Sequence, residues 1–156
     1  MSLLKSVDDL VCNIETSQCP YVVIGGIAVL LHGGRASTID FDFYILAGDF
    51  ERLKTFLVSH GAVVDLETEH QIRFKFAGIQ VDCLEADSVL SKTIFARAMR
   101  MKIVNTACNV ATPEDLIILK TLADRPIDRR DVAELREIFA ESLDEVYIVE
   151  TLKKYL

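Results

Sequence analysis

Two aspartates, Asp40 and Asp42, lie in the apolar segment IDFDFYIL (residues 39–46), whose alternation and aromatic content predict a β-strand. Alternate side chains of a strand share one face, so both carboxylates point the same way, about 6–7 Å apart. Like charges this close cost stability unless a cation lies between them. Carboxylate oxygens suit Mg²⁺ or Mn²⁺, which also bind the phosphate oxygens of a substrate.

A third aspartate, Asp82, repeats this pattern in the segment IQVDCL, where Val81 and Cys83 face one way and Gln80 and Asp82 the other. If the two strands are neighbours, three carboxylates meet. Three acids can hold two metal ions about 3.5–4 Å apart and clamp the oxygens of an in-line displacement at phosphorus. Asp82 could then also accept the proton of an attacking hydroxyl.

A glycine pair, Gly25 and Gly26, follows the predicted strand 21–24 and precedes a short apolar run at 27–31. Backbone amides without side chains, at the start of a helix, are suited to cradle a phosphate. A glycine pair after a strand is weak evidence alone, but the three aspartates strengthen it.

Taken in order, these features resemble the core of the DNA polymerase beta-like nucleotidyltransferase superfamily. The stretch IGGIAVLLHGGRASTIDFDFYI contains the glycine pair, a short helix and a hydrophobic-flanked Asp-x-Asp, and IQVDCLEA contains the third aspartate. The run from His32 to Asp42, together with ATPEDLIILKTLADRPIDRRDVAEL, is most similar to the toxin–antitoxin and abortive-infection branch of bacteria and archaea. The resemblance covers roughly residues 20–136.

The resemblance implies a role for each of these residues. Asp40 and Asp42 would ligate metal, Asp82 would complete the triad, and Gly25 and Gly26 would contact the triphosphate. Gly26 stands where many relatives have serine, whose hydroxyl can touch phosphate. We therefore expect a weaker or different grip on the triphosphate rather than inactivity.

Three further residues are candidate nucleotide contacts: Arg35, Thr38 and Lys120. Arg35 and Thr38 lie in the loop that enters the acidic strand, from which Arg35 could reach a β- or γ-phosphate. A solvated loop arginine is an equal alternative. The resemblance suggests that Lys120 projects toward the nucleotide, whereas a surface lysine with a packed aliphatic stem is an equal alternative.

Other polar residues have simpler interpretations. His32, beside two glycines, is expected at a helix end rather than as a ligand. Gln71, Arg73 and Lys75 share one strand face, which is most simply a solvated face, although a substrate contact is possible.

The segment DRRD places Asp128 and Asp131 on one helix face, with Arg125, Arg129 and Arg130 nearby. Surface ion pairs of small energetic value are the favoured interpretation. A contact with an acceptor or partner is less favoured.

Composition sets the class of protein. The chain has 156 residues, 51% of them hydrophobic, a net charge of −7 and no apolar run near the roughly 20 residues of a membrane helix. Asp8 and Asp9 stand where a secretory signal would be apolar, so we expect a cytoplasmic protein without membrane contact. Four scattered cysteines indicate buried free thiols rather than zinc ligands or disulfides. The acidic charge argues mildly against a broad nucleic-acid-binding face.

Periodicity and turn residues predict the elements that position the site. We expect helices near residues 7–14, 27–31, 49–59, 88–99, 112–123, 128–140 and 143–156, and strands at 21–24, 39–46, 62–66, 72–76, 79–84, 102–104 and 109–111. Gly78 marks a hairpin turn. This predicts an α/β (α+β) nucleotidyltransferase fold, with a small mixed β-sheet flanked by helices. It would form a single domain over residues 1–156, with a catalytic core at 20–110 and C-terminal helices at 112–156.

Two functions are in competition. The first is a metal-dependent nucleotidyltransferase that moves a nucleoside monophosphate from a nucleoside triphosphate to a hydroxyl on a protein side chain, a tRNA 3′ end or a small molecule. Because tRNA binding draws on phosphate neutralisation, the acidic charge favours a protein over tRNA. The second is a catalytically weak or inactive nucleotide-binding module that binds a cognate toxin or antitoxin protein. Gly26 and the short chain motivate the second. A structural domain with incidental acids is a weaker third.

Overall fold

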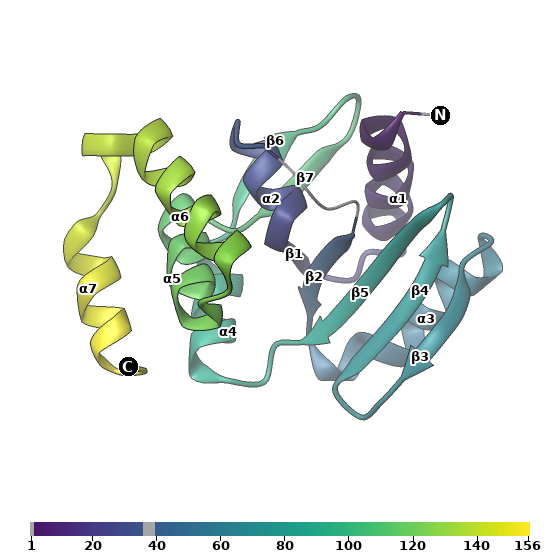
Figure 1. Cartoon of the computed structure of the whole chain (residues 1–156). Helices are drawn as coiled ribbons and strands as arrows, with labels where there is room; N and C mark the ends of the chain where they lie inside the picture. Colours follow the sequence, from purple (N-terminus) through teal and green to yellow (C-terminus); the bar gives the residue numbers. More distant parts are fainter. Residues whose placement is uncertain (1, 36–39) are drawn as a thin grey trace.

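The computed structural model describes residues 2–35 and 40–156, and within these ranges it contains a seven-stranded sheet in the order β3-β4-β5-β2-β1-β7-β6 (Figure 1). The strands are β1 (Tyr21–Ile24), β2 (Phe41–Ile45), β3 (Val63–Glu67), β4 (Gln71–Phe76), β5 (Ile79–Glu85), β6 (Met99–Lys102) and β7 (Ala107–Val110). The helices are α1 (Leu3–Ser17), α2 (Gly25–Leu31), α3 (Phe50–Ser59), α4 (Val89–Arg97), α5 (Pro113–Ala123), α6 (Pro126–Phe139) and α7 (Glu145–Lys153), with 3₁₀ turns at Ala47–Asp49 and Ala140–Ser142.

The sheet is mixed, as predicted. Strand β2 runs antiparallel to β1 and parallel to β5, and β1 is also parallel to β7. Hairpins join β3 to β4, β4 to β5 and β6 to β7. The α/β fold class is therefore confirmed, and the centre of the sheet is formed by the two strands that carry the aspartates.

Strand β2 separates the core from the site. Phe41, Phe43 and Ile45 are fully buried on one face, while Asp42 and Tyr44 are half-buried on the other. This is the period-two alternation read from the sequence, and it places the Asp42 carboxylate on the opposite side of the sheet from the aromatic core.

The C-terminal third is helical, as expected. Helices α5, α6 and α7 lie together at the left of Figure 1, where α5 packs against both α6 and α7. Thr112 caps α5 by accepting a hydrogen bond from the Asp115 amide, and Pro113 occupies its first turn. Helix α6 begins at Pro126, earlier than expected, because Asp128 accepts a hydrogen bond from the Arg125 amide and closes the first turn.

Two local expectations were wrong. Strand β6 spans Met99–Lys102 rather than 102–104, because its pairing with β7 joins Met99 to Val110 and leaves Ile103 and Val104 beyond the ladder. Cys12 is exposed, although the other three cysteines are buried free thiols as predicted.

None of the described helices combines the length and apolar character needed to cross a membrane.

Candidate active site

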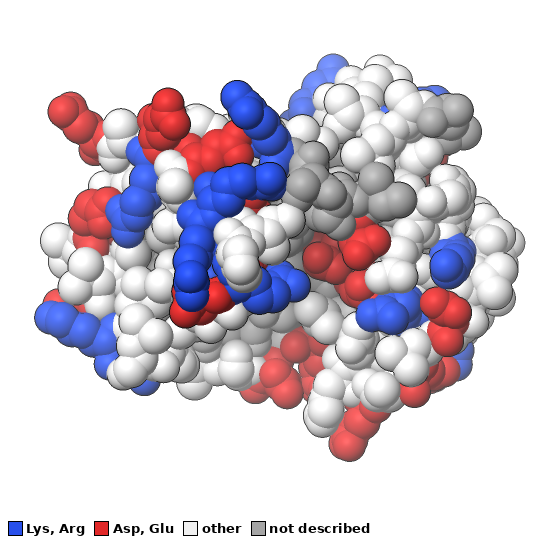
Figure 2. Space-filling view, in the orientation of Figure 1, with Lys and Arg blue, Asp and Glu red and all other residues white. Residues whose placement is uncertain are grey.

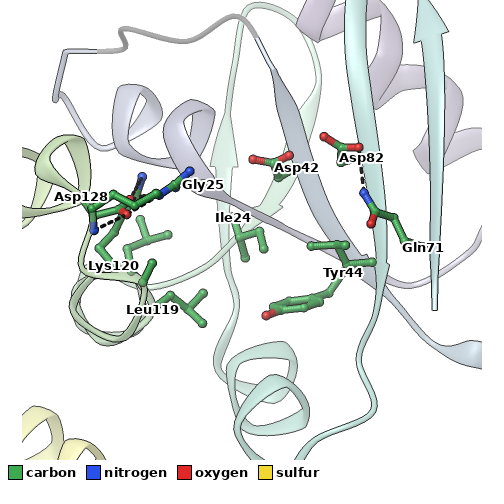
Figure 3. A pocket seen from close by; sticks show the side chains of 13 residues that line it. Ile24, Gly25, Asp42, Tyr44, Gln71, Asp82, Leu119, Lys120 and Asp128 are labelled. Carbon is green, nitrogen blue, oxygen red and sulfur yellow. Dashed lines mark hydrogen bonds and ion pairs between the residues drawn. The ribbon is translucent and has the colours of Figure 1, made fainter. Parts of the chain in front are cut away.

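Asp42 and Asp82 lie side by side at the centre of the sheet. They are register partners in the parallel pairing of β2 with β5, and Figure 3 shows both carboxylates on the same side of the ribbon. Burial, followed by the negative charges of Asp82 and Asp40, raises the pKa of Asp42 to about 6. The strand adjacency that the sequence could not establish is thereby confirmed, and it brings three carboxylates into one acidic cluster.

The carboxylate of Asp82 is held by three side chains. Arg73 Nε donates to Oδ1 at 2.8 Å, and Gln71 Nε2 donates to the same oxygen at 3.1 Å. Gln80 Nε2 donates to Oδ2 at 3.3 Å. These contacts restrict the orientation of the Asp82 carboxylate, whose side chain is only 11% exposed.

The expectation of a solvated face on β4 was therefore wrong for Arg73 and Gln71, although it is correct for Lys75, which is exposed. A signal for the Arg73 contact was present in the sequence. Gly78 was predicted to mark the hairpin turn. With a two-residue turn at Ala77-Gly78, counting outward pairs Arg73 with Asp82.

Gly25 brings the backbone against the acidic cluster. Its φ is +71°, a left-handed conformation that favours glycine, and a Cβ added to it would lie 2.5 Å from Asp42 Oδ2. Its neighbour Gly26 is buried in the first turn of α2. Gly25, the first residue of the glycine pair, therefore lies directly beside Asp42.

Lys120 of α5 lines the opposite wall of the site. It is 9% exposed, and its Nζ donates to Asp131 Oδ2 at 2.9 Å and lies 3.3 Å from Asp128 Oδ1. Asp128 and Asp131 on α6 are 0% and 3% exposed. The surface interpretations of this lysine and both aspartates were wrong, because α5 and α6 pack on each other and bury the faces that carry these groups.

Arg125 joins this wall from the loop between the two helices. Its Nε and Nη2 donate to Asp128 Oδ2 and Oδ1 at 2.6 and 3.1 Å, while its side chain is 68% exposed. By contrast, Arg129 pairs at 2.8 Å with Asp124, which is 63% exposed, as expected of a surface ion pair. Figure 2 shows basic side chains gathered over α5 and α6, opposite acidic side chains over β2 and β5.

A cavity of about 340 Å³ lies between the two walls (Figure 3). Asp42, Asp82 and Gly25 line one side, and Lys120, Arg125 and Asp128 line the other. The rest of the lining is mainly apolar and comprises Ile24, Tyr44, Leu84, Leu116, Leu119 and Ala123. The cavity therefore offers charged groups of both signs beside an apolar surface.

Two predicted contacts do not join this cavity. Arg35 is exposed and lines a separate hollow with Arg130 and Glu134, and its backbone amide donates to Glu134 Oε1 at 2.8 Å. Thr38 lies outside the described residues. His32 caps the end of α2 and is buried with Nε2 2.8 Å from the carbonyl of Ala111, which confirms its expected place at a helix end.

A family model described as nucleotidyltransferase of unknown function (DUF6036) matches residues 1–154. No curated protein sequence matches the chain.

Solved structures with a similar fold include ANT(2")-Ia in complex with adenylyl-2"-tobramycin, at a TM-score of 0.71 and 15% identity, with 98% of each chain covered. The lincomycin-bound lincosamide antibiotic adenylyltransferase LnuA has a TM-score of 0.68 and 14% identity, over 86% of this chain and 96% of that one. An antigenic nucleotidyltransferase-like protein from Paracoccidioides brasiliensis has a TM-score of 0.66 and 17% identity, over 97% and 87%. At these identities the likeness is one of fold.

Proposed function

Because the chain belongs to the nucleotidyltransferase family whose model matches residues 1–154, we propose that it transfers a nucleoside monophosphate from a nucleoside triphosphate to a hydroxyl, releasing pyrophosphate. The observation that carries this proposal is the register pairing of Asp42 with Asp82 directly beside Gly25. The cavity that Asp42 and Asp82 line, with Lys120, Arg125 and an apolar surface around them, supplies room for a nucleotide.

In this proposal Asp40, Asp42 and Asp82 hold Mg²⁺ or Mn²⁺. The donor set fits a hard divalent ion, because it consists of carboxylate oxygens whose mutual repulsion contributes to the raised pKa of Asp42. A bound ion would neutralise charge on the phosphate oxygens during displacement at phosphorus. The close approach of Gly25 to Asp42 leaves no room for a side chain between the backbone and the cluster.

The remaining chemistry is assigned to groups of the chain. Asp82 accepts the proton of the acceptor hydroxyl, with its carboxylate oriented by Arg73 and Gln71. The amides of Gly25 and Gly26 contact the triphosphate, as the family resemblance implies. Lys120, on the opposite wall, adds positive charge toward the phosphates. The apolar lining receives the base and sugar.

Calorimetric titration of each ribonucleoside triphosphate with Mg²⁺ tests the proposal. We expect the wild-type protein to bind at least one triphosphate only with the metal, and Asp42→Asn to lose this binding. Asp9→Asn is the control, since Asp9 lies on α1 in a surface ion pair with Lys5. Equal binding by the wild type and Asp42→Asn would reject the assignment of the site.

The acceptor is a further part of the proposal. ANT(2")-Ia and LnuA, which are matched over nearly their whole length, are described with adenylyl-2"-tobramycin and with lincomycin, and they support a small hydroxylated molecule. The resemblance to the toxin–antitoxin branch and the net charge of −7 support a hydroxyl on a partner protein. Labelled triphosphate separates these classes, because the label would move to a protein band, an RNA band or a small-molecule fraction.

The alternative is a nucleotide-binding module with little or no turnover, and Gly26 in place of serine favours it. This alternative predicts metal-dependent triphosphate binding without label transfer to any of the three fractions. A labelled product that disappears in Asp82→Asn would exclude it.

A further inference from the structure

Asp128 connects two cations of the cavity wall. This fully buried carboxylate accepts hydrogen bonds from the amide, Nε and Nη2 of Arg125 and lies 3.3 Å from the ammonium of Lys120. An arginine fork held at two nitrogens by a buried carboxylate has little freedom to rotate. The guanidinium of Arg125 is thus fixed in place although most of its surface is open to solvent.

The fixed guanidinium has donors left over. Arginine has five N–H groups, and the Asp128 contacts use Nε and one group of Nη2. Among the described residues, none accepts a hydrogen bond from Nη1. Arg125 lines the same cavity as Asp42 and Gly25. Its remaining donors are therefore available to a substrate bound in that cavity.

Arg129, in the first turns of α6, provides a contrast with Arg125, which immediately precedes that helix. Its side chain is 67% exposed, against 68% for Arg125, and each arginine pairs with one aspartate. Arg129, however, is absent from the cavity lining, and its partner Asp124 is exposed rather than buried. The hydrogen bond and charge of Asp128 raise the pKa of Arg125, and the charge of Asp42 raises it to a smaller extent.

We propose that Arg125 is a phosphate-binding residue of this site and that Asp128 is the residue that positions it. The proposal rests on the proposed function, because it assigns the triphosphate of the nucleotide substrate as the ligand. A guanidinium that offers several parallel donors matches phosphate geometry.

The test compares Arg125→Gln with Arg129→Gln. Calorimetry measures the dissociation constants of the triphosphate that the wild type binds most tightly and of the corresponding nucleoside, with Mg²⁺ present. We expect Arg125→Gln to weaken triphosphate binding by about tenfold to a hundredfold, because losing a hydrogen bond to a charged group changes a dissociation constant by about this factor. Nucleoside binding should be unchanged, and Arg129→Gln should stay within about twofold of the wild type.

The outcomes separate the two proposals. If the wild type binds none of the four ribonucleoside triphosphates, the proposed function itself fails. If the wild type binds one of them and Arg125→Gln binds it equally well, only the role of Arg125 is rejected. An equal loss in Arg129→Gln would also reject it, since the effect would then be one of net charge.

The positioning role of Asp128 is tested by a double-mutant cycle. If Asp128 acts through Arg125, Asp128→Asn weakens triphosphate binding in the wild type but adds no further loss to Arg125→Gln. Arg125→Lys keeps the charge without the planar fork and keeps the buried Asp128, so it tests positioning even if Asp128→Asn does not fold. Wild-type affinity in Arg125→Lys, or additive losses in the cycle, would contradict the positioning role.

Discussion

At the scale of single residues, Asp42 has the clearest chemical signature. Its pKa lies at about 6, above the ordinary value of 3.8, because the carboxyl is buried beside two other acids. The native protein therefore binds this proton more tightly than the unfolded chain does. The resulting stabilisation is fully present below about pH 4 and is lost as the pH rises through 6.

The first prediction follows from this loss of stability as the pH rises. In metal-free buffer at pH 8, Asp42→Asn should be more stable than the wild type by about 1–3 kcal/mol, because it removes a destabilising buried charge. Near pH 4 the two proteins should have similar stability. Urea unfolding across this pH range measures the difference, and a wild type more stable than Asp42→Asn at pH 8 would contradict the prediction.

The second prediction concerns Arg73, the residue that holds Asp82 Oδ1 at 2.8 Å. Arg73→Ala should lower the rate of transfer or the affinity for Mg²⁺ by about tenfold to a hundredfold, as expected when a residue that orients a metal-binding or catalytic carboxylate is removed. The control is Lys75→Ala, which removes an exposed cation from the same face of the same strand. Rates measured over a range of Mg²⁺ concentrations test this, and equal effects of the two variants would show that only charge matters.

At the scale of elements, the junction of β1 and α2 imposes the tightest steric constraint. Gly25→Ala should destabilise the protein by about 1–3 kcal/mol and abolish triphosphate binding, because the new Cβ would collide with the Asp42 carboxylate at a left-handed φ. Gly61→Ala is a suitable control, since Gly61 has a φ of +99° but open space around it. Similar binding losses in both variants would mean that backbone strain, rather than the collision, is responsible.

The buried ion network between α5 and α6 gives the fourth prediction. Lys120→Ala leaves two buried carboxylates without their shared ammonium, so it should lower the free energy of unfolding by about 3–5 kcal/mol. Lys153→Ala removes a pair in which both side chains are largely exposed, with Glu150, and should cost less than about 1 kcal/mol. Urea unfolding compares them, and equal losses would contradict a buried network.

Local patterns predicted the elements that the site depends on. Alternation in residues 39–46 predicted which face of β2 carries Asp42, and the helix expected near residues 112–123 is observed as α5 at Pro113–Ala123. The burial of Asp128 and Asp131 could not be predicted in this way, because it arises from how two helices pack. A charged pair at helical spacing looks the same in sequence on a buried or an exposed face.

At the scale of the whole molecule, the site is formed between the centre of the sheet and the C-terminal helices. The central strands provide Asp42 and Asp82, and the start of α2 provides the backbone of Gly25. Helices α5 and α6 and the segment between them provide the cations and part of the apolar lining (Figures 1 and 3). The parallel pairing of β2 with β5 brings together Asp42 and Asp82, which are 40 positions apart in the sequence. The sequence indicated that both residues belong to one site, but it could not show that their strands are neighbours. The fold thus brings polar residues that are far apart in the sequence to the lining of one cavity.

The measurement that tests the central claim most directly uses one triphosphate labelled at either the α- or the γ-phosphorus, incubated with the protein, Mg²⁺ and a total cell extract as the source of acceptor. Relative to the extract alone, we predict that the protein adds transfer of the α-label to an acceptor and adds no transfer of the γ-label, which leaves in pyrophosphate, and that Asp42→Asn adds neither. Added transfer of the γ-label, or added α-label transfer that persists in Asp42→Asn, would contradict nucleotidyl transfer at this site.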